Sequence, residues 1–184
     1  IVSKILGGQM FHFFESIDIQ ILFFIQEHYK TSLFDKLMPI ITKLGNIGIF
    51  WIVLACIFIF IKKYRKIGIM IFISIFLCTL VGNIILKPLV KRIRPFELVY
   101  FTQLLISAPK DFSFPSGHTM VSFASASVII SQNKKWGIYA FILAFLIGFS
   151  RLYLFVHFPT DVIIGAFIGS ILGVVSIKIY NKYI

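Results

Sequence analysis

Residues 137–177 read GIYAFILAFLIGF SRLYLFVHFPTD VIIGAFIGSILGVVSI, and the middle block, 150–161, separates two apolar runs. Each run, extended by a few flanking residues, has about the 20 residues that a helix needs to cross a bilayer. The middle block carries an arginine, a histidine and an aspartate, and charges so close to a membrane must be paired or hydrated. The stretch therefore predicts two membrane helices joined by a short polar connection.

The composition of the whole chain is that of a membrane protein. Of its 184 residues 59% are hydrophobic and 14% are charged, whereas about 25% are charged in a soluble domain. This length holds about six membrane helices and little else, so we predict an all-α bundle forming one membrane domain over 1–184. The net charge of +11 could suggest nucleic-acid binding, but the lysines cluster at the ends of apolar runs and no basic arm accompanies them. We therefore predict contact with membrane lipids and none with nucleic acid.

Six segments are candidate helices, and they differ in strength. The run 117–132 is short and rich in Ser, Ala and Gly, which predicts a helix buried among others. The run 10–29 contains Glu15, Asp18 and Gln20, so it either crosses the membrane with one wet face or lies along the surface, and we favour crossing. Together with 117–132, the strongest candidates form the predicted core of the domain over 44–180; they are 44–62, 67–86, 136–154 and 161–180.

Clusters of lysine and arginine predict the orientation of these helices. By the positive-inside rule the clusters at 62–66, 134–135 and 178–182 are cytoplasmic, which puts the segments 87–116 and 151–160, like 30–43, on the outer side. The outer segment KPLVKRIRP, 87–95, nevertheless holds four cations. This exception to the charge rule indicates a second use for them.

In KPLVKRIRP, Lys87, Lys91 and Arg94 are spaced i, i+4, i+7 and share one face if the helix continues past Pro88. They would then form a cationic stripe. Lys91 and Arg92 taken alone, however, are more typical of side chains that snorkel from a helix end toward water.

The block FPSGHT, 114–119, predicts an anion site at the start of a helix. Ser116 can cap the helix, which leaves the backbone N–H groups of Gly117 and His118 pointing outward at the positive end of the helix dipole. Gly117 also allows a close approach of a ligand to the backbone. His118 can donate a proton near neutral pH.

The opening block supplies the remaining polar groups. Arg151 is a forked, permanently charged donor suited to an oxyanion. Asp161 follows His157 by four residues, within reach of its ring, and a carboxylate that keeps one ring nitrogen protonated leaves the other free as nucleophile or base. Because topology places the three blocks on one side, they predict a positive pocket for an anion such as phosphate. The residues alone leave open which histidine attacks.

The few acidic and sulfur ligands argue against a metal site. Only Asp161 lies within the three blocks, with Glu97 and Asp111 in the loop between them, so no carboxylate cluster is predicted. Cys56 and Cys78 lie inside apolar runs and are expected neither in a disulfide nor as thiolate ligands.

Taken together, the three blocks resemble the type 2 phosphatidic acid phosphatase (PAP2) superfamily, which also includes the vanadium haloperoxidases. The likeness covers about 30–180 and rests on Lys87, six residues, Arg94-Pro95; Pro115-Ser116-Gly117-His118; and Ser150-Arg151, five residues, His157, three residues, Asp161. It implies a helical membrane phosphatase that works through a phosphohistidine, with neither metal nor other cofactor.

Carried onto this chain, the resemblance implies that His157 is the nucleophile, that Asp161 orients it, and that His118 protonates the leaving oxygen. The groups implied to bind the phosphoryl oxygens are Lys87, Arg94, Ser116, the Gly117 amide and Arg151.

The implied substrate is a lipid phosphate that enters sideways from the bilayer of a bacterial plasma membrane. Undecaprenyl diphosphate is slightly preferred over phosphatidylglycerophosphate and phosphatidate, because a pocket facing outward suits recycling of the cell-wall lipid carrier. Two other classes stay open: a non-enzymatic anion channel or transporter, and a haloperoxidase-like use of the same oxyanion pocket.

Overall fold

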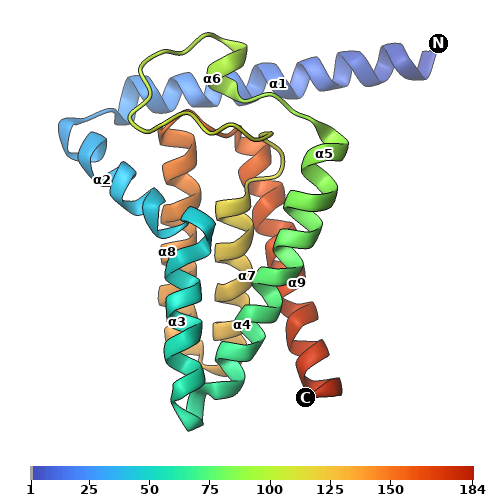
Figure 1. The fold of residues 1–184 in the computed structure, drawn as a ribbon. Coiled ribbons are helices and arrows are strands. Elements are labelled where there is room, and N and C mark those ends of the chain that lie inside the picture. Colours follow the sequence, from blue (N-terminus) through green and yellow to red (C-terminus); the bar gives the residue numbers. More distant parts are fainter. Residues whose placement is uncertain (1) are drawn as a thin grey trace.

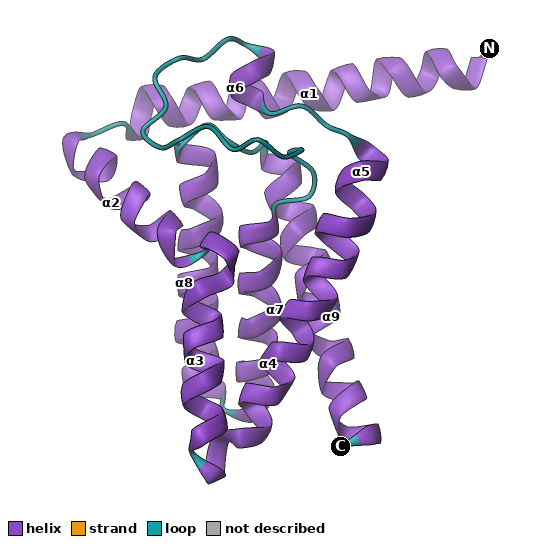
Figure 2. Ribbon diagram, viewed as in Figure 1, coloured by secondary structure: helices purple, strands orange, loops and turns teal. Residues whose placement is uncertain are grey.

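The computed structural model describes the backbone of residues 2–184 and the side chains of residues 15–184. Over this range the chain is helical and contains no strand, and Figure 2 shows its longest loop lying across one end of the molecule. The helices are α1 (Val2–Tyr29), α2 (Ser32–Leu44), η1 (Asn46–Gly48), α3 (Ile49–Phe60), η2 (Lys62–Tyr64), α4 (Arg65–Cys78), η3 (Thr79–Leu86), α5 (Lys87–Val90), α6 (Pro95–Leu98), α7 (Gly117–Gln132), α8 (Lys134–Tyr153) and α9 (Pro159–Tyr183).

The bundle is built around α7, which packs against both α8 and α9 (Figure 1). Within the part of the chain that the structure describes, three helical stretches are long and apolar enough to cross a membrane: 62–98, α8 and α9. A fourth is possible if α2 counts as one span with η1 and α3, which are bent from it by 47°. The predicted all-α membrane fold is confirmed, and α7 is the buried helix expected from the Ser- and Ala-rich run 117–132.

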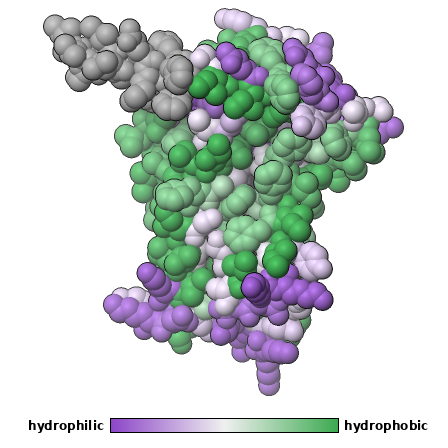
Figure 3. All heavy atoms as spheres, turned by 180° about the vertical axis from the view of Figure 1, so that it is seen from behind, coloured by the Kyte–Doolittle hydropathy of each residue, from purple (hydrophilic) through white to green (hydrophobic). Residues whose placement is uncertain are grey.

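The two ends of the bundle have different roles. Figure 1 shows the turns at 62–66 and 134–135 and the C-terminal residues at one end, with the long loop and α1 at the other. Seen from behind, hydrophilic side chains gather at the ends and hydrophobic ones lie between them (Figure 3). The segments 87–116 and 151–160 therefore share the end opposite the basic turns. This is the arrangement that the basic clusters at 62–66, 134–135 and 178–182 predict.

Helix α1 lies across the end of the bundle rather than along it (Figure 1). Leu22 and Ile25 are buried against the bundle, while Ile21 and Phe24 are exposed. The side chains of residues 10–14 lie outside the described residues. The run 10–29 thus lies along the end of the bundle (Figure 1), and the favoured prediction that it crosses the membrane is not followed. The reason is electrostatic, because Asp18 is buried at this end and ion-paired there with Arg92.

Close contact between α7 and α9 depends on glycine. Gly165, Gly169 and Gly173 are spaced four residues apart, so they form one face of α9. A Cβ at Gly169 would lie 2.2 Å from the backbone oxygen of Met120 on α7, closer than atoms can approach. This small-residue face sets the distance between α7, which begins in the block FPSGHT, and α9, which begins in the block SRLYLFVHFPTD.

We predict that Gly169→Val lowers the free energy of unfolding by about 1–3 kcal/mol, because the added side chain forces α9 away from α7. Thermal unfolding in detergent measures this. Val174→Ile is the matched control, since Val174 is exposed on the same helix and has room for the added carbon. Equal stability of the two variants would contradict the proposed helix contact.

Candidate active site

A cavity of about 1150 Å³ lies at the α1 end of the bundle, against the long loop. It brings together residues from all three sequence blocks, which are more than 60 residues apart at their extremes. The predicted site residues that line it are Lys87, Arg94, Gly117, His118, Arg151 and His157. Asp161 and Ser116 are fully buried behind this lining.

Asp161 holds one side of the His157 ring. It lies in the first turn of α9, and its Oδ2 is 3.4 Å from His157 Nδ1. The same oxygen accepts the backbone N–H of Phe158 at 3.0 Å and the hydroxyl of Ser113. Because an ionised carboxylate only accepts hydrogen bonds, this contact favours the tautomer of His157 that carries its proton on Nδ1.

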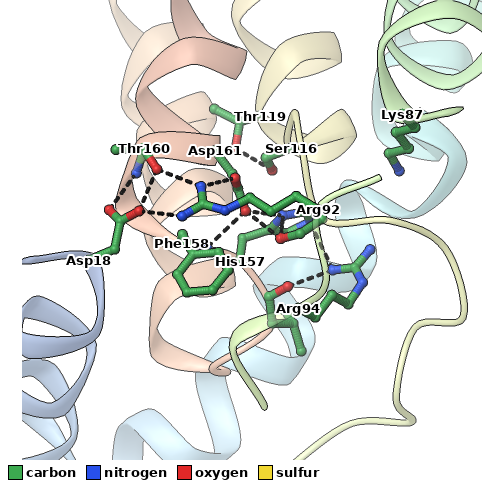
Figure 4. Close-up of polar contacts among 12 residues, drawn as sticks. Asp18, Lys87, Arg92, Arg94, Ser116, Thr119, His157, Phe158, Thr160 and Asp161 are labelled. Carbon is green, nitrogen blue, oxygen red and sulfur yellow. Dashed lines mark hydrogen bonds and ion pairs between the residues drawn. The ribbon is translucent and has the colours of Figure 1, made fainter. Parts of the chain in front are cut away.

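The other ring nitrogen of His157 faces cations. Arg94 Nη1 lies 3.2 Å from Nε2, and the same group donates to the Val156 carbonyl at 2.5 Å (Figure 4). Burial, then the positive charges of Arg94, Arg151 and Lys87, hold the pKa of His157 well below its ordinary value. The imidazole is therefore neutral, with a lone pair on Nε2 at the side where an anion would be held.

The loop carboxylate of Asp111 bridges two of the predicted anion-binding cations. Arg94 Nη2 donates to its Oδ1 at 2.7 Å, and Lys87 Nζ contacts its Oδ2. Burial raises the pKa of the Asp111 carboxyl, but the hydrogen bond and charge of Lys87, and then those of Arg94, outweigh it and place the pKa well below the ordinary range. Asp111 thus occupies the position in which Lys87 and Arg94 could hold a phosphoryl group.

Arg151 enters the cavity with an incomplete set of partners. Its Nη1 donates to Thr42 Oγ1 at 2.6 Å, which ties α8 to α2. Its Nε is buried and has no hydrogen-bond partner among the described residues. A buried guanidinium donor without a partner is unfavourable, so an anion in the cavity would complete its hydrogen bonds.

His118 is fixed from a segment that no sequence block contains. Its Nε2 lies 2.8 Å from Asn46 Oδ1, at the bend that joins α2 to α3. A Cβ at Gly45 would lie 2.6 Å from Cδ2 of the ring, so only glycine allows the ring to pack here. The glycine-rich turn LGNIG at 44–48 is the sequence feature that marks this segment. It lies outside the three motif blocks, so sequence reasoning did not include it in the site.

The structure corrects the predicted role of Ser116 at the helix start. Ser116 precedes α7 but makes no side-chain cap hydrogen bond. Its hydroxyl lies 2.9 Å from Thr119 Oγ1, and its N–H donates to the Asp161 carbonyl. Since it is turned away from the cavity, Ser116 positions the Gly117 amide and lies behind the anion site.

The cationic stripe predicted for KPLVKRIRP is also corrected. Helix α5 continues past Pro88 but ends at Val90, and Lys91 has a left-handed backbone with a φ of 51°, so the helix does not reach Arg94. Lys91 is exposed and lies outside the cavity lining. Arg92, predicted to snorkel, is instead ion-paired with Asp161 at 2.7 Å.

This arrangement fits transfer of a phosphoryl group. A neutral imidazole stands beside cations from three segments and the N-terminus of α7, and a second histidine lines the same cavity. Donors fixed in advance around a developing negative charge supply the largest catalytic effect in many enzymes. Among the side chains that the structure describes, no group of three His, Cys, Asp or Glu residues gathers to bind a metal.

Comparison with known proteins gives concordant relatives. The sequence model of the PAP2 superfamily matches residues 63–184. A protein of Sulfolobus acidocaldarius named undecaprenyl-diphosphatase is 32% identical over 181 residues, which are 97% of this chain and 84% of that one. The crystal structure of the transmembrane PAP2 type phosphatidylglycerolphosphate phosphatase from Bacillus subtilis has a TM-score of 0.74 and 27% identity, covering 92% of this chain and 87% of its own. Aquifex aeolicus LpxE has a TM-score of 0.71 and 31% identity, covering 86% and 93%.

We predict that Asp111→Asn binds inorganic phosphate about threefold to tenfold more tightly, because the anion no longer competes with a bound carboxylate for Lys87 and Arg94. Isothermal titration calorimetry in detergent measures the affinity. Glu27→Gln removes the same charge from an exposed position on α1 outside the cavity lining and is the control. Unchanged or weaker binding by Asp111→Asn would mean that Asp111 supports the two cations without occupying the anion site.

Proposed function

The chain belongs to the PAP2 superfamily, and because the relatives reported above include proteins named as phosphatases, we propose that it hydrolyses undecaprenyl diphosphate to undecaprenyl phosphate. The observation that carries the proposal is the neutral His157 ring held between Asp161 and Arg94 at the edge of a cationic cavity. The similarity of nearly the whole chain to a protein named undecaprenyl-diphosphatase supports the choice of lipid.

In the proposed first step, Nε2 of His157 attacks the terminal phosphorus. A bond from nitrogen to phosphorus forms while the bond from phosphorus to the bridging oxygen breaks. Burial, and then the nearby positive charges led by Arg151, lower the pKa of His118 to about 2, so the anionic substrate must first offset these charges and let the ring take up a proton. His118 then gives this proton to the bridging oxygen, and the lipid monophosphate leaves. Asp161 stabilises the positive charge that develops on the ring.

In the second step water attacks the phosphohistidine. His118, now neutral, accepts the proton of the water, the bond from phosphorus to nitrogen breaks, and inorganic phosphate leaves. Through both steps, Lys87, Arg94, Arg151 and the Gly117 amide hold the phosphoryl oxygens, and Asp111 must release the first two. The scheme requires no metal.

The site's place in the membrane agrees with this substrate. The cavity lies at the end opposite the basic turns at 62–66 and 134–135. The positive-inside rule then puts it on the extracytoplasmic side of a bacterial plasma membrane. We propose that the lipid phosphate enters this cavity sideways from the bilayer and that one membrane domain over 1–184 contains the whole site.

A phosphatidylglycerophosphate or phosphatidate phosphatase is the second candidate, favoured by the similarity to the Bacillus subtilis enzyme of that name. A non-enzymatic anion transporter is disfavoured, because the predicted site residues gather at one end of the bundle and do not line a path through it.

We expect purified protein in detergent to release phosphate from undecaprenyl diphosphate faster than from phosphatidylglycerophosphate or phosphatidate, with or without EDTA. His157→Ala should lower kcat by at least about 10³-fold, because it removes the nucleophile. His28→Ala, which alters an exposed histidine of α1, is the control. Loss of turnover in EDTA, or full activity of His157→Ala, would rule out the mechanism.

The acidic limb of the profile of kcat/KM against pH is expected below about pH 6.5, the ordinary pKa of histidine. The lowered pKa of His157 keeps the ring neutral, and therefore nucleophilic, as the pH falls through that value. Arg94→Gln should move this limb to higher pH because it removes a nearby positive charge. Lys91→Asn, which removes an exposed charge nearby, should leave the limb in place.

A further inference from the structure

Behind Asp161, on the side away from the cavity, Arg92 lies between two buried carboxylates. Its Nη1 donates to Asp161 Oδ1 at 2.7 Å, and its Nη2 donates to Asp18 Oδ2 at 2.7 Å (Figure 4). Asp18 is 1% exposed and Asp161 is fully buried. The two carboxylates come from α1 and α9, and the arginine comes from the loop after α5.

Further contacts fix the plane of this guanidinium. Thr160 accepts from Arg92 Nη1 at 2.7 Å, and its backbone N–H donates to Asp18 Oδ1 at 3.0 Å. The guanidinium carbon lies 3.8 Å from the centre of the Phe158 ring. Arg92 is therefore held by hydrogen bonds in its plane and by an aromatic ring against its face, a geometry that lysine cannot reproduce.

The two oxygens of Asp161 have separate tasks. Oδ2 lies 3.4 Å from Nδ1 of His157, while Oδ1 is taken by Arg92. A buried carboxylate that loses its cation tends to bind a proton or to move toward another donor. In either case Asp161 no longer accepts a well-aligned hydrogen bond from the His157 ring. A change at Arg92 therefore alters the orientation of His157 through one intervening residue, Asp161.

We propose that Arg92 and Asp18 are positioning residues of the reaction: Asp18 fixes Arg92, Arg92 fixes Asp161, and Asp161 fixes His157. This inference rests on the proposed function. It makes the surface helix α1 a part of the catalytic apparatus, although no residue of 15–29, the part of α1 whose side chains the structure describes, lines the cavity.

Other contacts hold α1 in place, so the ion pair can be tested separately from docking. Leu22 is fully buried, Ile25 is 6% exposed, and Gln26 Nε2 donates to the Tyr153 carbonyl at 2.7 Å. Asp18→Asn keeps the size and one acceptor oxygen of the side chain and removes only its charge. We expect α1 to stay docked in this variant.

The test compares kcat and KM for phosphate release from undecaprenyl diphosphate and from p-nitrophenyl phosphate by protein that elutes as a single folded species. For Arg92→Gln we expect kcat to fall about tenfold to a hundredfold while KM changes less than about twofold, as for partners that orient a reacting group. Asp18→Asn should lower kcat less. Adding Asp18→Asn to Arg92→Gln should lower it no further, because both act through Asp161.

Lys91→Asn is the matched control, since it removes an exposed cation next to Arg92 and asparagine tolerates the left-handed backbone there. Its kcat should equal that of the wild type. The proposal that Arg92 and Asp18 position His157 through Asp161 is overturned if the Arg92 and Asp18 variants keep wild-type kcat, or if these variants change KM alone. If Arg92→Gln does not fold, Asp18→Asn alone tests the proposal, and a wild-type kcat in this variant overturns it. Wild-type protein that cleaves neither substrate would overturn the proposed function as well.

Discussion

The hydrogen bonds and ion pair of the buried Asp161 carboxylate determine how one end of the bundle is arranged. It is fully buried, yet it is contacted by Arg92, Ser113, the Phe158 amide and the ring of His157. Burying an ionised carboxylate is unfavourable unless its lone pairs are satisfied, so these donors must all be present when the chain folds. They come from the loop after α5, the loop before α7 and the start of α9. One charge thereby specifies how three segments meet.

A second constraint is the repulsion among the cations of the cavity. Lys87, Arg94 and Arg151 lie in or next to the cavity in a weakly polar environment, where like charges repel strongly. Asp111 offsets part of this repulsion for two of them. A phosphoryl group can take over that task because it carries more negative charge and accepts more hydrogen bonds. The same electrostatic demand therefore stabilises the folded loop and favours an anionic ligand.

The sequence revealed contacts that are local and missed those that are long-range. Asp161 and His157 are four residues apart at the start of a helix, so their contact follows from local geometry. Arg92 and Asp18 are 74 residues apart, and nothing in the local pattern indicates that they meet. Ser116 has the residue type and place of a helix cap, but its hydroxyl contacts Thr119 in the first turn of α7, and only its N–H makes a long-range contact, with the Asp161 carbonyl.

The placement of α1 shows why composition could not decide between a crossing and a surface helix. Both alternatives require apolar residues on one side and polar ones on the other, and the run 10–29 provides both. Asp18 favours the surface position, because a single buried carboxylate is stable only where its cation lies. Arg92 is held at the cavity end by Asp161 and Thr160, so α1 must lie across that end. The position of this surface helix thus agrees with the charge balance next to the active site, while the apolar contacts of Leu22 and Ile25 also hold the helix there.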